Sequence, residues 1–524
     1  MSRRIFRILA LAIPGFVIAG QIPAASAAAP AAPGASCEKL MGLTLPNVTI
    51  TSAGHVPANG FIAPGQQAPM TLPTFCRVQA IASPSADSEI HFEVWIPPMD
   101  AWNGKFQGEG VGGYDGSISY GAMATGLQHG YAVMGNDLGH TGGDLKFGEG
   151  HPEKVIDWAY RAMHVTAEAG KLIVRDSAGK WPEHAYFVGC STGGHQALSE
   201  AQRYPDDYDG IVAGDPAYDR VHQTASYIWA WMAVHDQNGA PLFTPAKLQT
   251  VTKAAVAACD GIDGIKDGVI DDPRRCKFDP ATLICTGAET DSCLTPLQAD
   301  GVKKVYAGLK NPRTGEQIFP GFSPGSEGFG NGAGQGWMGF IVSPKTPMRS
   351  EVYKYLLFND PNWDWHSFDF DKDVAYSDAK IGYMAAVDHD LSRFRNRGGK
   401  LIMYTGWADP VAAPEDIVKY YEGAVKAMGG LDKTQSFYRF FMAPGMGHCG
   451  GGYGPDTFDA VAALEQWVEH GTAPEKILAS HSVDKTVQRT RPLCPYPQVA
   501  RWTGKGSTDD AANFVCKAAD GEKR

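Results

Sequence analysis

A short glycine-rich stretch at residues 189–194, which reads G-C-S-T-G-G, constrains this chain more than any other part of the sequence. An apolar run at 185–188 precedes it, and an apolar pattern with helical spacing follows until Pro205. The stretch matches G-x-S-x-G. Strand, tight turn and helix are the context in which that motif projects a serine hydroxyl from the end of a sheet. An ordinary glycine-rich turn gives the same pattern, so Ser191 needs partners elsewhere to act as a nucleophile.

Strand and helix patterns alternate on both sides of this stretch, which predicts an α/β fold with a parallel sheet. The alternation stops between 218 and 389, a region rich in Trp, Tyr, Gly and Pro that holds four cysteines. A long insertion of this kind commonly forms a lid over the carboxyl ends of the strands. We therefore predict a catalytic domain at 28–217 and 390–524 with a lid domain at 218–389.

The first 27 residues have the pattern of a secretory signal peptide, with arginines, an apolar run at 8–19 and a small-residue cleavage site at 25–27. No later apolar run is long enough to span a bilayer, so the sequence predicts a secreted or periplasmic protein without a membrane partner. The net charge of −11 argues against binding to nucleic acid, which needs a basic face. The sequence leaves the oligomeric state unknown.

A serine nucleophile needs a base and a carboxylate that orients the base, and in an α/β-hydrolase they follow in the order Ser, Asp or Glu, His. Ser191, Asp409 and His448 have this order, and each follows a predicted core strand. Asp215 also follows a strand and is the alternative acid. A further glycine-rich turn, G-E-G-V-G-G at 108–113, matches G-x-G-x-x-G. Since no helix pattern follows it directly, it favours an oxyanion donor over a dinucleotide site.

Ten cysteines in an exported chain indicate disulfides. Eight cysteines alone allow 105 connectivities, so spacing leaves the pairing open. A bridge between Cys190 and Cys449 would hold their Cα atoms within roughly 7 Å and would bring Ser191 and His448 together. The four closest remaining pairs are Cys37 with Cys76, Cys259 with Cys276, Cys285 with Cys293 and Cys494 with Cys516.

An acidic loop near the start of the predicted lid carries Asp260, Asp263 and Asp267 with backbone carbonyls between them. Oxygen ligands are the kind that Ca²⁺ prefers. The spacing is not that of an EF-hand, and a solvated acidic turn has the same composition.

Taken together, G-C-S-T-G-G, the W-A-D loop at 407–409 and P-G-M-G-H-C at 444–449 resemble the tannase/feruloyl esterase family, which includes MHETase-like hydrolases. The resemblance extends from Cys37 to Cys516. It implies an α/β-hydrolase fold with a calcium-carrying lid, and all five cysteine pairs named above fit the family pattern.

The resemblance also assigns roles to residues. It implies the triad Ser191, Asp409 and His448, with the backbone N–H groups of Gly113 and Thr192 as oxyanion donors. The resemblance does not place the lid arginine that holds a substrate carboxylate in MHETase-like members. Arg349 is the nearest candidate, and this weakens the interpretation of the chain as a PET-monomer hydrolase. The implied calcium ligands are Asp260, Asp263 and Asp267 with the carbonyls of Ile265 and Val269.

The expected function is that of a secreted serine carboxylesterase acting on small esters of aromatic, phenolic acids, of feruloyl esterase or tannase type. One alternative is an MHETase-like hydrolase of synthetic aromatic monoesters. Another is a non-catalytic, calcium-dependent binding protein on a hydrolase fold. The sequence does not distinguish the acyl and alcohol groups of the substrate.

Overall fold

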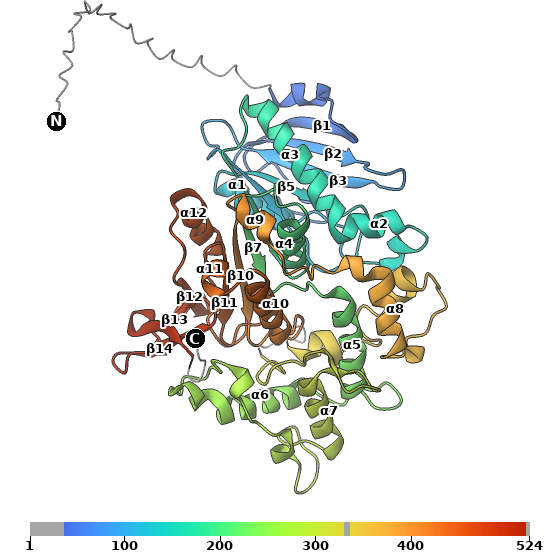
Figure 1. Cartoon of the computed structure of the whole chain (residues 1–524), viewed down its shortest axis with the longest axis vertical. Helices are drawn as coiled ribbons and strands as arrows, with labels where there is room; N and C mark the ends of the chain where they lie inside the picture. The colour runs from blue at the N-terminus through green and yellow to red at the C-terminus, as the bar shows by residue number, and fades with distance from the viewer. Residues whose placement is uncertain (1–35, 330–335, 520–524) are drawn as a thin grey trace, which may run out of the picture.

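The architecture comes from a computed structural model, which describes residues 36–329 and 336–519. The predicted signal peptide lies outside the described residues. A sheet of nine strands runs through the molecule in the order β1-β2-β3-β5-β4-β6-β7-β10-β11 (Figure 1). Its strands are β1 Val48–Val56, β2 Phe75–Ala82, β3 Ile90–Ile96, β4 Lys105–Glu109, β5 Ala132–Asn136, β6 His184–Cys190, β7 Gly210–Gly214, β10 Lys400–Gly406 and β11 Tyr438–Ala443.

The sheet is mixed. From β5 through β4, β6, β7 and β10 to β11, every neighbouring pair is parallel. The pairs β1–β2, β2–β3 and β3–β5 are antiparallel. The α/β fold class is confirmed, and the parallel half is the part in which strand and helix patterns alternate in the sequence. The antiparallel edge formed by β1 and β2 is an addition that this alternation did not predict.

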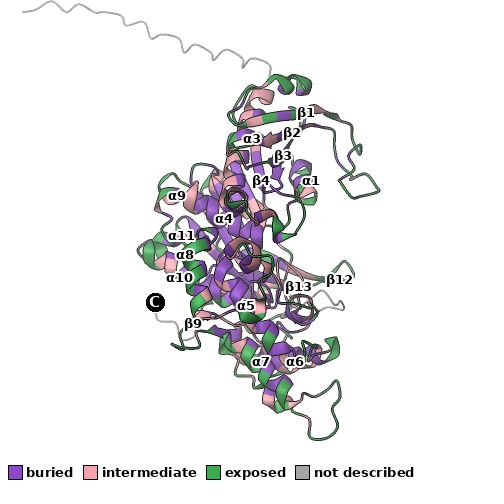
Figure 2. Ribbon diagram, turned by 90° about the vertical axis from the view of Figure 1, so that its right-hand side faces the viewer, coloured by how far each residue is buried: buried purple, intermediate pink, exposed green. Residues whose placement is uncertain are grey.

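Helices cover both faces of the sheet, so its strands are buried on both sides, as parallel strands usually are. Strand β6 shows this alternation, because the neighbouring side chains of Tyr186 and Phe187 are both fully buried but belong to two different core clusters. Figure 2 shows α4 and the central strands largely buried. The helices are α1 Tyr120–Gln128, α2 Pro152–Ile156, α3 Ala162–Ala178, α4 Thr192–Arg203, α5 Arg220–Val234, α6 Pro245–Cys259, α7 Pro296–Ala307, α8 Lys372–Ile381, α9 Ser392–Asn396, α10 Pro414–Ala427, α11 Leu431–Gln435 and α12 Ala460–His470.

The predicted lid, residues 218–389, makes up most of the segment between β7 and β10. It contains α5 to α8 and a small hairpin, β8 (Leu309–Lys310) with β9 (Gln317–Phe319). Figure 1 places α5, α6 and α7 beyond one end of the sheet. Buried side chains of this segment, such as Trp337, belong to the same continuous core as Phe187 of the sheet. The inserted segment therefore packs directly on the catalytic domain.

Two hairpins follow α12, and the sequence analysis did not predict them. They are β12 (Ile477–Val483) with β13 (Thr486–Leu493) and β14 (Gln498–Trp502) with β15 (Phe514–Ala518). All ten cysteines are paired in the five bridges that the resemblance implies. Within the described ranges, no helix has both the length and the apolar character that a membrane span requires.

Candidate active site

Ser191 lies in the turn between β6 and α4, with a backbone φ of 64° and ψ of −117°. This left-handed conformation is unusual for a residue with a side chain, and it is the strained turn that the G-x-S-x-G motif predicts. The turn needs glycine at 189, because a Cβ there would lie 2.5 Å from the carbonyl carbon of Gly193. Local sequence and backbone sterics thus present the serine hydroxyl at the carboxyl end of the sheet.

The structure brings the three predicted triad residues together. The Oγ of Ser191 lies 2.7 Å from Nε2 of His448, and Nδ1 of the same ring lies 2.7 Å from Oδ2 of Asp409. The side chain of His448 is 15% exposed and that of Asp409 is fully buried. A serine proton can therefore pass to an imidazole that a buried carboxylate orients, which is the geometry of nucleophilic acyl transfer.

Asp409 is fixed by its own loop after β10. Its Oδ1 accepts hydrogen bonds from the N–H groups of Val411 at 2.6 Å and Ala412 at 3.0 Å, which leaves Oδ2 for His448. Since both carboxylate oxygens have assigned donors, the orientation of the imidazole ring is determined.

The electrostatic surroundings of His448 make it a stronger base than an ordinary histidine. Burial lowers its pKa, but the charge and the hydrogen bond of Asp409 raise it, and the charge of Asp215 raises it further. Arg349 acts in the opposite direction. The net result is a raised pKa for His448, because the carboxylates outweigh the loss of solvent.

The predicted oxyanion donors lie on two adjoining turns. Thr192 is the first residue of α4, so its N–H is among the helix-terminal donors that have no intrahelical partner. Gly113 has a φ of 61°, and its carbonyl accepts a hydrogen bond of 2.7 Å from the hydroxyl of Thr192. This hydrogen bond holds the two turns together next to the nucleophile.

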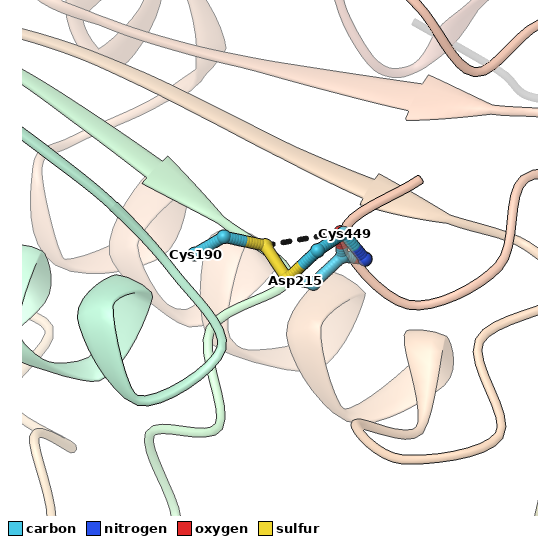
Figure 3. Close-up of side chains that lie close together, drawn as sticks. All are labelled: Cys190, Asp215 and Cys449. Atoms are coloured by element: carbon cyan, nitrogen blue, oxygen red, sulfur yellow. Dashed lines mark hydrogen bonds between the residues drawn. A yellow bond between two sulfur atoms is a disulfide. The ribbon is translucent and has the colours of Figure 1, made fainter. Parts of the chain in front are cut away.

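Asp215, the alternative acid, does not contact the imidazole through a hydrogen bond. It lies behind the Cys190–Cys449 bridge, whose Cα atoms are 6.0 Å apart, and Figure 3 shows its carboxylate against the two cysteines. One of its oxygens accepts a hydrogen bond of 3.0 Å from the N–H of Cys449. The structure therefore assigns the contact with His448 to Asp409 and gives Asp215 a different set of partners.

Sequence reasoning missed one charged residue beside the nucleophile. Arg220, at the start of α5, is 1% exposed and donates to the hydroxyl of Thr192. Among residues 36–329 and 336–519, its Nε and Nη1 find no hydrogen-bond partner, and neither does Nη1 of Arg349. Both guanidinium groups lie over the ring of Tyr114. Nothing in the sequence around Arg220 marks it as special, because helix α5 buries it only through packing with distant segments.

The acidic loop at 260–269 follows α6 and is contacted by Arg489 and Arg491 of β13. Burial raises the pKa of the Asp263 carboxyl, and the neighbouring carboxylates of Asp267 and Asp260 raise it further. The carboxylate of Asp267 already has a partner within the protein, because its Oδ2 accepts a hydrogen bond of 2.5 Å from the guanidinium of Arg491.

This donor set fits a hard divalent cation in its chemistry, because it consists of carboxylate and carbonyl oxygen atoms. Ca²⁺ ligands at about 2.4 Å from the ion lie at most about 4.8 Å apart. Among the described residues, the three carboxylates of the loop do not form a group within that distance, so a bound ion would draw them closer.

Comparison with known proteins places this chain in one family. The family described as tannase and feruloyl esterase matches residues 76–517. An uncharacterized esterase of Xanthomonas campestris pv. campestris is 40% identical over 528 residues, which cover 92% of this chain and 91% of that protein. A mono(2-hydroxyethyl) terephthalate hydrolase of Piscinibacter sakaiensis is 33% identical over 87% of each chain.

Among solved structures, feruloyl esterase B from Aspergillus oryzae is 29% identical and superposes with a TM-score of 0.85, covering 92% of this chain and all of that one. With its sheet, its nucleophile turn and its paired cysteines, this chain belongs to the tannase and feruloyl esterase family and is an ester hydrolase.

Proposed function

We propose that this chain is a serine carboxylesterase that hydrolyses small esters of aromatic acids, with Ser191, His448 and Asp409 as its catalytic triad. The observation that carries the proposal is the pair of 2.7 Å contacts that His448 makes, one with the serine hydroxyl and one with the buried carboxylate. Aromatic rings next to the oxyanion turn support an aromatic acyl group, since Tyr114 stacks on Trp158 with ring centroids 4.3 Å apart.

The reaction runs in two halves. The Oγ of Ser191 attacks the ester carbonyl carbon while Nε2 of His448 takes the hydroxyl proton. The imidazolium then gives this proton to the leaving alcohol, and the acyl group remains on the serine. Water next attacks the acyl carbon, His448 takes a proton from it, and the proton returns to Ser191 as the acid leaves.

Negative charge develops on the carbonyl oxygen in both halves. The N–H groups of Gly113 and Thr192 would stabilise it, each by about 3 kcal/mol. Asp409 keeps the ring oriented and stabilises the imidazolium without itself taking the proton.

The test is Ser191→Ala assayed on methyl ferulate, methyl gallate and p-nitrophenyl acetate. We expect a folded protein without measurable turnover, because no acyl-enzyme can form. A phosphonate or a PMSF-type reagent should label Ser191 in the unaltered protein. Retention of more than about a tenth of the activity by the alanine variant would contradict the triad assignment.

A second candidate function is the hydrolysis of aromatic monoesters that carry a free carboxylate. The unpartnered, buried N–H groups of Arg220 and Arg349 favour it, because a buried cation without a counter-ion is costly and an anionic substrate would pair with it. Mono(2-hydroxyethyl) terephthalate and its methyl ester distinguish the two functions, since only the free acid would gain from the arginines. The third alternative, a binding protein without activity, is disfavoured because both hydrogen bonds of the triad are present and the chain belongs to a family of ester hydrolases.

We also propose a structural Ca²⁺ at the acidic loop, held by the carboxylates of Asp260, Asp263 and Asp267 and by the carbonyls of Ile265 and Val269. The ion would neutralise the clustered carboxylates and would take no part in the chemistry. Five disulfides support a secreted or periplasmic location, where the compartment is oxidising.

A further inference from the structure

Asp215 is a fully buried carboxylate at the end of β7 that the triad does not use. Its backbone φ is 36°, in the left-handed region that a residue other than glycine adopts only when its surroundings hold it there. Three groups donate hydrogen bonds to its carboxylate: the hydroxyl of Thr405 at 2.7 Å, the N–H of Gly406 at 2.9 Å and the N–H of Cys449 at 3.0 Å. A carboxylate with this many donors fixes the segments that supply them.

The donors belong to the loops that present the base and the acid. Gly406 lies three residues before Asp409, and Cys449 directly follows His448. The connection also reaches the nucleophile, because the N–H of Ser191 donates to the carbonyl of Gly214, the residue before Asp215, at 2.9 Å. Figure 3 shows the carboxylate beside the disulfide that joins the nucleophile and base loops. The side chain of Asp215 therefore contacts the end of β10 and the loop after β11, while the backbone of the preceding residue, Gly214, holds the nucleophile turn.

The charge of Asp215 also lies close to the catalytic base. One carboxylate oxygen of Asp215, one of Asp409 and one ring nitrogen of His448 all lie within 4.8 Å of one another. The charge of Asp215 raises the pKa of His448, and burial together with Asp409 raises the pKa of Asp215 itself to about 7. Two carboxylates thus face one imidazole, one through a hydrogen bond and one through space.

We propose that Asp215 is a positioning residue of the esterase: its carboxylate holds the acid loop and the base loop in register beside His448. This inference rests on the proposed triad. The competing interpretation is a carboxylate that stabilises the fold alone, as many buried hydrogen-bonded side chains do. The two interpretations differ in what they predict for the pH profile.

Asp215→Asn is the sharpest variant. Asparagine tolerates a positive φ nearly as well as aspartate does, so the backbone strain does not change. Its amide oxygen can still accept from Thr405 and Gly406, while its NH₂ group faces the N–H of Cys449. The variant therefore loses one hydrogen bond, that to the base loop, together with the negative charge.

The matched control is Glu93→Gln in β3, far along the sheet. Glu93 is also a buried carboxylate with several donors, among them the indole N–H of Trp95 at 2.8 Å and the guanidinium of Arg77 at 2.8 Å. Its loss removes a comparable set of contacts without touching the triad. Both variants are compared with the unaltered protein by melting temperature and by kcat and KM on p-nitrophenyl acetate from pH 5 to 9.

We expect Asp215→Asn to lower kcat by about tenfold to a hundredfold with little change in KM, because a displacement of the base near 1 Å costs about that much. The acid limb of its kcat/KM profile should move to lower pH, since a negative charge facing His448 is gone. The other groups that face this imidazole and Asp215 are Asp409, Arg349 and Tyr404, and they are unaltered. Glu93→Gln should lose stability only and keep both kcat and the acid limb.

The proposal fails if Asp215→Asn keeps kcat within about twofold or leaves the acid limb in place while losing stability as the control does. If that variant does not fold, Thr405→Val replaces it. Without the Thr405 hydroxyl, the ionised carboxylate of Asp215 loses one hydrogen bond and its charged form is less stable. We expect a smaller loss of kcat and a shift of the acid limb to lower pH, and an unchanged pH profile overturns the proposal. Ser191→Ala in the same series separates failure of this proposal from failure of the proposed function, because activity of the alanine variant would contradict the triad itself.

Discussion

The active site and the acidic loop of the lid are each fastened by a disulfide, and the two bridges join segments at very different distances along the chain. Cys190 and Cys449 are 259 residues apart, while Cys259 and Cys276 are 17 apart. The first bridge connects the nucleophile loop to the base loop across the sheet. The second closes one short stretch of the lid that already contains all five proposed calcium ligands.

The polar supports of the two regions differ in the same way. Asp215 ties together loops that follow different strands, whereas Arg489 and Arg491 of β13 donate to the carbonyl and the carboxylate of a single residue, Asp267. Acyl transfer needs three groups placed to within a fraction of an ångström, and ion binding needs compensation of local charge. We therefore expect changes in the first region to affect turnover and changes in the second to affect stability.

The largest expected effect is that of Asp409→Asn. Asparagine keeps the shape but cannot stabilise the imidazolium or select its tautomer, and the corresponding change in a serine protease triad costs about 10⁴-fold in kcat. We expect a loss of about 10³-fold to 10⁴-fold here, measured as kcat on p-nitrophenyl acetate. A loss below about tenfold would mean that another carboxylate, with Asp215 as the nearest, serves as the acid.

The second expected effect concerns the bridge between the catalytic loops. Replacing both Cys190 and Cys449 by alanine should lower kcat and also the melting temperature, since the entropic model predicts stabilisation on the order of 5 kcal/mol for so long a loop. The comparison variant replaces Cys494 and Cys516, which close a loop of 22 residues and should contribute about 3 kcal/mol. It should lose stability but keep kcat below its melting temperature. Equal, full activity in both double variants would remove the catalytic role of the first bridge.

The third prediction tests the proposed calcium site at the acidic loop. Excess EGTA should lower the melting temperature by several degrees, because a ligand that binds only the native state stabilises it by about 2.7 kcal/mol at a hundred times its Kd. Initial rates at 25 °C should stay unchanged. Asp263→Asn should make the melting temperature insensitive to EGTA. An unchanged melting temperature, with no metal found by elemental analysis, would contradict a calcium site.

The smallest expected effect is a displacement of the pH profile. His448 must be neutral to accept the serine proton, and its pKa is raised above the ordinary value of 6.5. The midpoint of the acid limb of kcat/KM should therefore lie above pH 6.5. The raised pKa also affects stability. The contribution of His448 to the free energy of unfolding is fully present below the pKa of the unfolded state and is lost as the pH rises through the pKa of the folded state. A midpoint below that of a free histidine would contradict this electrostatic picture.

Much of the candidate site could be predicted from the sequence because its signals are local. The G-x-S-x-G turn needs only the residues beside Ser191, since the steric demand for glycine at 189 arises within the same turn. Parallel strands end at one edge of a sheet, so the order of Ser191, Asp409 and His448 after predicted strands implied their convergence. The acidic loop is also contiguous.

Other features could not be predicted, because they depend on contacts between distant segments. The antiparallel edge strands β1 and β2 and the C-terminal hairpins carry weak periodic signals, and β13 reaches the acidic loop across 222 residues. Arg220 is an ordinary arginine in the sequence, and only the packing of α5 against the nucleophile turn buries it.

The sequence by itself determined which residues are proposed to react, because residue type, glycine placement and strand order are properties of short segments of the chain. Only the tertiary structure decided how they are held. Asp215 is one of two acids that follow a predicted strand, so the sequence alone leaves its role open. Its hydrogen bonds with Thr405 of β10 and with Cys449 of the base loop join residues that are 190 and 234 positions apart. Hydrogen bonds of this range depend on the position of every strand between them, so no local pattern encodes them.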